Sequence, residues 1–194
     1  MTGMEVAAPP FFTPAYASFD EFVPGDGILE PEELEEIARA IAARPPVWKP
    51  LVKLDAERRR YELLYEDDRM DAWVLSWMPG QATGFHDHYI SSVGVCVAAG
   101  TVREDQMLYG VPAVERELRQ GMSRRGDPSY IHRVQYLDGA PAVTIHVYSP
   151  RLDWVGQYRV DDGGTIRREV QPGRNELKAQ LLSEGALHGV LERF

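Results

Sequence analysis

Between residues 61 and 160 the chain consists largely of short runs of β-branched and aromatic residues, separated by Gly, Pro or Asp. Many short runs with frequent turn residues are typical of an all-β sandwich or barrel. No internal repeat or low-complexity tract interrupts the pattern. The sequence therefore predicts an all-β fold with strands at residues 61–65, 72–77, 93–98, 102–109, 130–136, 143–148 and 154–160.

Helical patterns flank this β region on both sides. Pro31 is followed by two acids, and Leu34, Ile37 and Ile41 then recur at helical spacing. Proline at the first helical position and acids in the first turn both favour a helix start. Leucines beyond residue 175 predict a second helical segment. We expect a single domain with an N-terminal lead-in and helical segment at residues 1–60, a β-barrel at 61–170 and a helical tail at 171–194.

Charge and cysteine content limit the partners and the compartment. The 194 residues carry a formal net charge of −9, which argues against nucleic acids and anionic membrane surfaces because both attract clustered positive charge. No apolar run approaches the roughly 18 to 20 residues of a membrane span, and we see no secretory signal pattern. Cys96 is the only cysteine, which excludes an internal disulfide and fits a reducing compartment. We expect a cytoplasmic protein that acts on a small molecule, with no protein partner implied.

The first chemical signal is the sequence His86-Asp87-His88 inside the β region. On an extended backbone, residues i and i+2 point to the same face, so both imidazoles can bind one metal while the residue between them points away. Gly80 precedes His86 with five residues between them, and Gly100 follows His88 after eleven. This spacing resembles the first motif of the cupin superfamily, whose members are small β-barrels.

A third histidine is expected to complete the metal site. Residues 128–132 read Pro-Ser-Tyr-Ile-His and resemble the second cupin motif, which would supply His132 from a neighbouring strand. Many cupins add a glutamate ligand from the first motif. Val93 occupies that position here, so we expect no carboxylate ligand from it. Imidazoles alone also accept zinc, nickel or copper, so the spacing does not identify the metal.

A polar stripe marks the predicted strand at 143–148. Thr144, His146 and Tyr148 share one face, and Ile145 and Val147 share the other. If the polar face points inward, the three groups can bond to one another in a hydrogen-bonded chain. Such a chain avoids the free-energy cost of an unpaired buried polar group, which is roughly 1 to 3 kcal/mol. If the apolar face points inward, the polar residues lie on the surface. The residues alone leave both arrangements open.

Taken together, these residues resemble the cysteine dioxygenase-like family of thiol dioxygenases. The resemblance spans about half of the chain and rests on residues 73–80, Phe85-His86-Asp87-His88, His132 and Ile145-His146-Val147-Tyr148-Ser149-Pro150. It implies one Fe(II) per chain held by the three histidines, a thiolate and dioxygen bound side by side, and a sulfinate product. It also implies that Thr144, His146 and Tyr148 form a relay that orients substrate and oxygen.

Two residues depart from the family pattern. Leu63 stands where cysteine-using members have an arginine that binds the substrate carboxylate, and leucine cannot make that pair. Another arginine can compensate, with candidates at 58, 59, 60, 133 and 151, or the substrate is not cysteine. Val93 replaces a cysteine that animal members link to the relay tyrosine. Cys96 is expected to face the opposite side, as a buried structural thiol.

The predicted pocket residues favour an apolar and aromatic substrate environment. Leu63, Trp77 and Tyr89 are the expected substrate-binding residues, and aromatic faces attract quaternary ammonium groups. A betaine thione such as ergothioneine would suit this pocket. The alternatives are a cysteine dioxygenase proper with a relocated carboxylate anchor, a non-redox metal-binding cupin, and a sensor or binding module without catalysis. His188 in the tail is assigned no role.

Overall fold

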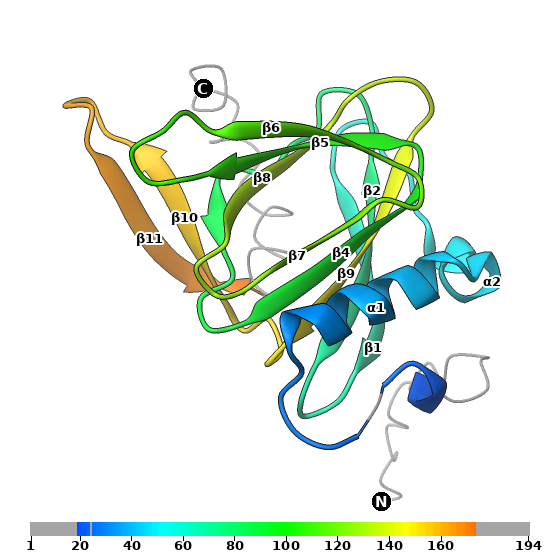
Figure 1. Cartoon of the computed structure of the whole chain (residues 1–194). Helices are drawn as coiled ribbons and strands as arrows, with labels where there is room; N and C mark the ends of the chain where they lie inside the picture. Colours follow the sequence, from blue (N-terminus) through cyan, green and yellow to red (C-terminus); the bar gives the residue numbers. More distant parts are fainter. Residues whose placement is uncertain (1–18, 24, 174–194) are drawn as a thin grey trace, which may run out of the picture.

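The computed structural model describes residues 19–23 and 25–173, and its core is two antiparallel sheets whose inner faces pack together (Figure 1). In spatial order, the first sheet contains β1 (Arg60–Glu66), β2 (Asp71–Trp77), β9 (Ala142–Ser149), β4 (Ser92–Ala99) and β7 (Ser123–Gly126). The second contains β11 (Ile166–Pro172), β10 (Trp154–Val160), β3 (His86–Asp87), β8 (Ile131–Tyr136), β5 (Thr101–Met107) and β6 (Val114–Arg119). The all-β, cupin-type architecture expected from the sequence is confirmed.

All seven predicted strands are present, and four strands were not predicted. β6, β7 and β11 form edges of the two sheets and carry mostly charged or polar residues, so they lack the apolar alternation that marks a strand in sequence. β3 has only two residues. The missed strands are therefore either polar edges or too short to show a period.

The helix α1 (Pro31–Ala42) covers the outer face of the first sheet (Figure 1). Pro31 occupies the first turn, and Glu30 and Glu33 form a reciprocal capping box at the start of the helix. The apolar side of α1 packs on β4 and β9 in one buried cluster. Gly94 on β4 permits this contact, because a Cβ there would lie 2.2 Å from the carbonyl carbon of Leu34. The remaining helices in the described residues are η1 (Phe19–Glu21), α2 (Pro45–Trp48) and η2 (Lys49–Leu51).

This helix decides which face of β9 points inward. Every residue of β9 is buried. Ile145 and Val147 belong to the cluster under α1, so Thr144, His146 and Tyr148 point to the interior between the two sheets. The outer face of a sheet is normally polar because it is exposed to water. Here α1 shields an apolar outer face of β9, so the polar face lies in the interior.

Parts of two sequence-based expectations fall outside the described residues. They are the predicted helical tail, including His188, and most of the irregular lead-in at residues 1–27. Within the part of the chain that the structure describes, no helix has the length and apolar character needed to cross a membrane.

Candidate metal centre

Three histidines from two backbone segments meet between the sheets. His86 lies on β3 and pairs in register with His132 on β8, while His88 lies in the turn that follows β3. Their ring centroids are 4.7 to 5.1 Å apart. One nitrogen from each ring lies within 4.8 Å of the other two, a spacing that could hold a single metal ion. The structure therefore brings together the three histidines that the sequence singled out.

The ring nitrogens at this centre fit the requirements of metal ligands. Burial lowers the pKa of His86 to about 3 and the pKa of His88 well below its ordinary value, so both imidazoles are neutral near pH 7. Nε2 of His132 and both ring nitrogens of His88 are buried without a hydrogen-bond partner. Unpaired buried nitrogens are unfavourable, and a bound metal would satisfy one lone pair on each ring.

Hydrogen bonds at the opposite nitrogens fix two of the rings. Nδ1 of His86 donates to the carbonyl oxygen of Gly84 at 3.0 Å, and Nδ1 of His132 donates to a carboxylate oxygen of Glu104 at 2.9 Å. Carbonyl and carboxylate oxygens only accept, so each Nδ1 carries the hydrogen and each Nε2 presents its lone pair to the centre. This is the arrangement by which protein groups orient metal-binding histidines.

Glu104 is the functional candidate that the sequence analysis missed. Its carboxylate is 1% exposed and also accepts a hydrogen bond from the hydroxyl of Tyr130 at 2.9 Å, with Nε of Arg124 at 3.6 Å. Burial raises the pKa of Glu104, but the bonds from His132 and Tyr130 outweigh it and the pKa falls below its ordinary value. Glu104 is therefore ionised. One sequence feature could have identified it. Glu104 stands two residues after the apolar Val102 in a predicted strand, so both side chains lie on the same face.

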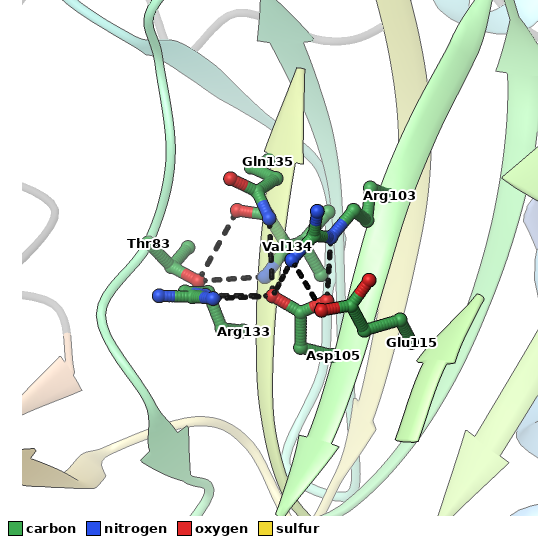
Figure 2. Close-up of polar contacts among 7 residues, drawn as sticks. All are labelled: Thr83, Arg103, Asp105, Glu115, Arg133, Val134 and Gln135. Atoms are coloured by element: carbon green, nitrogen blue, oxygen red, sulfur yellow. Dashed lines mark hydrogen bonds and ion pairs between the residues drawn. The ribbon is translucent and has the colours of Figure 1, made fainter. Parts of the chain in front are cut away.

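The segment that leads to His86 is hydrogen-bonded to the backbone of β8. Thr83 donates its N–H to the carbonyl of Val134 at 2.8 Å and accepts the N–H of Val134 on its hydroxyl at 2.9 Å (Figure 2). Beside them, buried Asp105 accepts hydrogen bonds from Arg103, Arg133 and Gln135. The guanidinium of Arg133 also lies over the ring of Phe85 at 4.8 Å. These contacts hold the strands of His86 and His132 in a fixed relation.

The polar stripe of β9 forms a hydrogen-bonded chain beside the histidines. Thr144 Oγ1 lies 3.0 Å from Nε2 of His146, and Nδ1 of His146 lies 3.1 Å from the hydroxyl of Tyr148. The indole N–H of Trp77 donates to Thr144 Oγ1 at 2.9 Å. The ring of Tyr148 is 5.1 Å from the ring of His88. The chain therefore ends next to the candidate metal ligands.

The chemistry of the donors sets the direction of the hydrogen bonds in this chain. Burial lowers the pKa of His146 well below its ordinary value, so the ring is neutral and carries one hydrogen. The indole of Trp77 can only donate, so the hydroxyl of Thr144 accepts from it and keeps its own hydrogen, which it can give to Nε2 of His146. In that tautomer, Nδ1–H of His146 donates to the oxygen of Tyr148. The hydroxyl hydrogen of Tyr148 is then directed to a group other than His146.

The expected substrate-binding residues lie in different surroundings. Trp77 is fully buried and bonded to Thr144, whereas Leu63 on β1 and Tyr89 after β3 are 42% and 43% exposed. Tyr89 has a backbone φ of 60°, in the left-handed region. The guanidinium of Arg59 lies 5.1 Å from the ring of Trp77.

Arg59 stands out among the arginines considered as carboxylate anchors. Its charge lowers the pKa of both His86 and His146, although burial is the larger cause for each, so it lies near the centre. Arg60 and Arg151 are paired with carboxylates at 3.3 and 2.9 Å, and Arg133 is held by Asp105.

Val93 and Cys96 lie on opposite faces of β4. Val93 is buried and pairs in register with Tyr148, so neither a carboxylate ligand nor a link to the tyrosine arises from that position. Cys96 is buried in the cluster under α1, and burial raises the pKa of its thiol to about 11. The expectation of a buried Cys96 facing away from the centre is confirmed.

Solved structures similar to this chain come from several bacteria. A protein from Thermus thermophilus is 24% identical, with a TM-score of 0.48, and the match covers 53% of this chain and 93% of that one. A Klebsiella pneumoniae protein with a double-stranded β-helix domain is 19% identical, with a TM-score of 0.47 and coverages of 53% and 80%. A cupin superfamily protein from Desulfitobacterium hafniense is 12% identical, with a TM-score of 0.46 and coverages of 55% and 90%.

The sequence comparison identifies the family. No curated protein matches the chain significantly. The family model described as cysteine dioxygenase type I matches residues 1–160, which include the three histidines, Trp77 and the polar stripe of β9. The chain belongs to the cysteine dioxygenase type I family.

Proposed function

We propose that the protein is a non-haem Fe(II) thiol dioxygenase that adds both atoms of dioxygen to the sulfur of a small thiol or thione. The observation that carries the proposal is the buried cluster of His86, His88 and His132 without a carboxylate among its candidate ligands, in a chain of this family. Iron bound by these imidazoles would supply the redox chemistry and attract an anionic sulfur, because neutral ligands leave the metal its full positive charge.

The reaction balances without a further reductant. A thiolate and one dioxygen give a sulfinate, with two new sulfur–oxygen bonds and cleavage of the oxygen–oxygen bond. Sulfur loses four electrons and dioxygen gains them. The chain's own residues therefore need to bind, orient and exclude water rather than deliver electrons.

Tyr148 is the proposed catalytic residue that faces the substrate. In the tautomer with hydrogen on Nδ1, His146 donates to its oxygen, and the phenol hydrogen is available to a substrate or oxygen atom near His88. Thr144 and His146 hold the phenol in that orientation, and burial keeps the ring of His146 uncharged by lowering its pKa. Trp77 anchors the far end of the relay through Thr144.

The substrate proposal has two candidates. Leu63 in place of the family arginine, together with Trp77 and Tyr89, supports an apolar, cation-tolerant pocket and a betaine thione such as ergothioneine. Arg59 supports the second candidate, a carboxylate-bearing thiol such as cysteine or a mercapto-acid, because its positive charge reaches the histidine centre. Arg59 also covers one face of Trp77, where a substrate cation would otherwise bind.

Oxygen uptake by the iron-loaded protein, with quantification of sulfinate, tests the activity. The panel contains ergothioneine, cysteine, a mercapto-acid and cysteamine, with wild type and Tyr148→Phe. We expect thiol-dependent uptake with at least one compound, and loss of most turnover or coupling in Tyr148→Phe with its metal retained. Absence of thiol-dependent uptake with every compound would instead favour a non-redox cupin or a binding module.

Arg59→Gln, compared with Arg60→Gln, separates the two substrate candidates. If Arg59 anchors a carboxylate, its substitution raises KM for cysteine or the mercapto-acid roughly tenfold or more and leaves cysteamine unchanged. Arg60 pairs with Asp55 near the surface and serves as the matched control. An unchanged KM for carboxylate thiols in Arg59→Gln would remove the second candidate.

A further inference from the structure

The segment that carries two of the candidate metal ligands has little backbone support. β3 contains only two residues and pairs with β10 and β8 through a few positions. His88 follows it in a turn, and the next residue, Tyr89, adopts a φ of 60°. A left-handed conformation is unfavourable for a residue other than glycine and persists only where its surroundings enforce it. Side-chain contacts must therefore help to hold this segment.

Asp87, between the two histidines, supplies those contacts. Its carboxylate is 3% exposed and accepts the backbone N–H of Tyr89 at 2.8 Å and the hydroxyl of Tyr158 on β10 at 2.7 Å. Arg168 on β11 donates to it twice, from Nε at 2.6 Å and from Nη2 at 2.8 Å. A two-point pair between arginine and carboxylate fixes direction as well as distance. The bond to the N–H of Tyr89 fixes the turn directly after His88.

Gly156 provides the space for this pair. It lies opposite Asp87 in the register of β10 and β3, and β10 lies between β3 and β11 in the second sheet. Figure 1 shows β10 and β11 side by side. A Cβ on Gly156 would lie 2.5 Å from Nε of Arg168 and 2.6 Å from Oδ2 of Asp87. Any larger residue would displace the pair. The guanidinium carbon of Arg168 also lies 5.9 Å from the centre of the Tyr89 ring, so Arg168 lies beside both residues that flank His88.

We propose that Arg168 is a positioning residue for the metal centre, acting through the two-point pair with Asp87 that holds the His86–His88 segment. Arg168 lies beyond residues 1–160, the part of the chain that matches the family. The proposal rests on the three histidines binding a metal, as in the proposed function, but not on the reaction. An arginine that stabilised only the fold would change the unfolding free energy of the apoprotein and leave metal affinity unchanged.

The test measures metal affinity of the full chain without any substrate. Apoprotein is titrated with Co(II) in competition with a chelator, the visible spectrum of bound Co(II) is recorded, and apoprotein stability is measured in parallel. We expect Arg168→Ala to weaken Co(II) binding about tenfold or more and to alter the spectrum, because supporting contacts of metal ligands typically contribute roughly 10- to 100-fold in affinity. Arg168→Lys should bind Co(II) more tightly than Arg168→Ala but more weakly than wild type. Lysine keeps the positive charge but lacks the planar guanidinium that bonds both carboxylate oxygens of Asp87.

Arg167→Ala is the matched control. Arg167 is the adjacent residue of β11, is 65% exposed and pairs with Asp161, so its loss removes the same charge without touching β3. Gly156→Ala should reproduce the Arg168→Ala effect while leaving both charges in place. Tyr158→Phe removes one hydrogen-bond donor to Asp87 and should give a smaller loss of Co(II) affinity. If Arg168→Ala and Gly156→Ala do not fold, the comparison of Tyr158→Phe with wild type tests the proposal.

The proposal is overturned if Arg168→Ala and Tyr158→Phe bind Co(II) within twofold of Arg167→Ala, or if the wild-type protein binds no Co(II). Metal affinity that depends on Arg168 supports it even if no thiol is oxidised. In that case the proposed function fails while the positioning role stands.

Discussion

Replacing Thr144 by valine tests the relay of β9 at its central link. Valine keeps the branched shape but removes the hydroxyl, so the indole N–H of Trp77 loses its acceptor at 2.9 Å and Nε2 of His146 loses its donor at 3.0 Å. Thr144 and Trp77 are fully buried, so water cannot replace these bonds. Each unpaired buried group costs about 1 to 3 kcal/mol, so the loss of two partners should lower the unfolding free energy by about 2 to 6 kcal/mol.

The same substitution should affect turnover through the position of one hydrogen. The hydroxyl of Thr144, by donating to Nε2 of His146, favours the tautomer with hydrogen on Nδ1. Without that hydroxyl, Nδ1 can lose its hydrogen and instead accept the phenol hydrogen of Tyr148. A bias of about 1.4 kcal/mol corresponds to a tenfold population change, so we expect turnover to fall about tenfold or more. The assays are denaturant unfolding of the apoprotein and sulfinate formation by the iron-loaded protein.

Thr144→Ser is the matched control, because it keeps the hydroxyl and loses only a methyl group. It should retain most of the turnover despite a small packing loss. Equal stability and equal turnover of Thr144→Val and Thr144→Ser would show that the hydrogen-bonded chain of β9 contributes neither to folding nor to catalysis.

Three further predictions concern other parts of the molecule. Glu104→Gln should weaken metal binding about tenfold while the apoprotein stays folded, because an amide accepts the Nδ1–H of His132 less strongly than a carboxylate; an unchanged Kd for Co(II) would contradict this. Gly94→Ala should lower the unfolding free energy, measured by denaturant unfolding, by about 1 to 3 kcal/mol, because the added Cβ meets the backbone of α1. An unchanged unfolding free energy would mean that α1 can move away from β4 without cost. Cys96 should react with iodoacetamide at pH 8 only after unfolding, because a pKa of about 11 instead of 9.0 leaves about a hundredfold less thiolate; rapid reaction of the folded protein would contradict its burial.

The sequence predicted seven of the eleven strands in the described residues and singled out the three histidines, because their signals are local. Alternation at 143–148 and the spacing around His86 and His88 do not depend on distant residues. The direction in which Thr144, His146 and Tyr148 point was left open by the residues alone. It depends on α1, which comes about a hundred residues earlier and shields the other face of β9.

Glu104 and Arg168 were missed because in sequence they look like surface charges. Glu104 stands between Arg103 and Asp105 in a polar strand. Only the fold shows that its carboxylate meets His132 and Tyr130, while Arg103 and Asp105 bond to each other (Figure 2). Arg168 follows another arginine on an edge strand, and its partner Asp87 is 81 residues away. Long-range pairs of this kind follow from the fold and carry no local pattern.

The proposed function requires that an iron centre held by three histidines adds both atoms of one dioxygen molecule to a substrate sulfur. The most direct measurement is mass spectrometry of the product formed by the iron-loaded protein from its preferred thiol under isotopically labelled dioxygen. We predict a sulfinate in which both added oxygen atoms carry the label, and no such product from a His132→Ala variant. Oxygen uptake that yields only disulfide or a singly labelled product would contradict the claim.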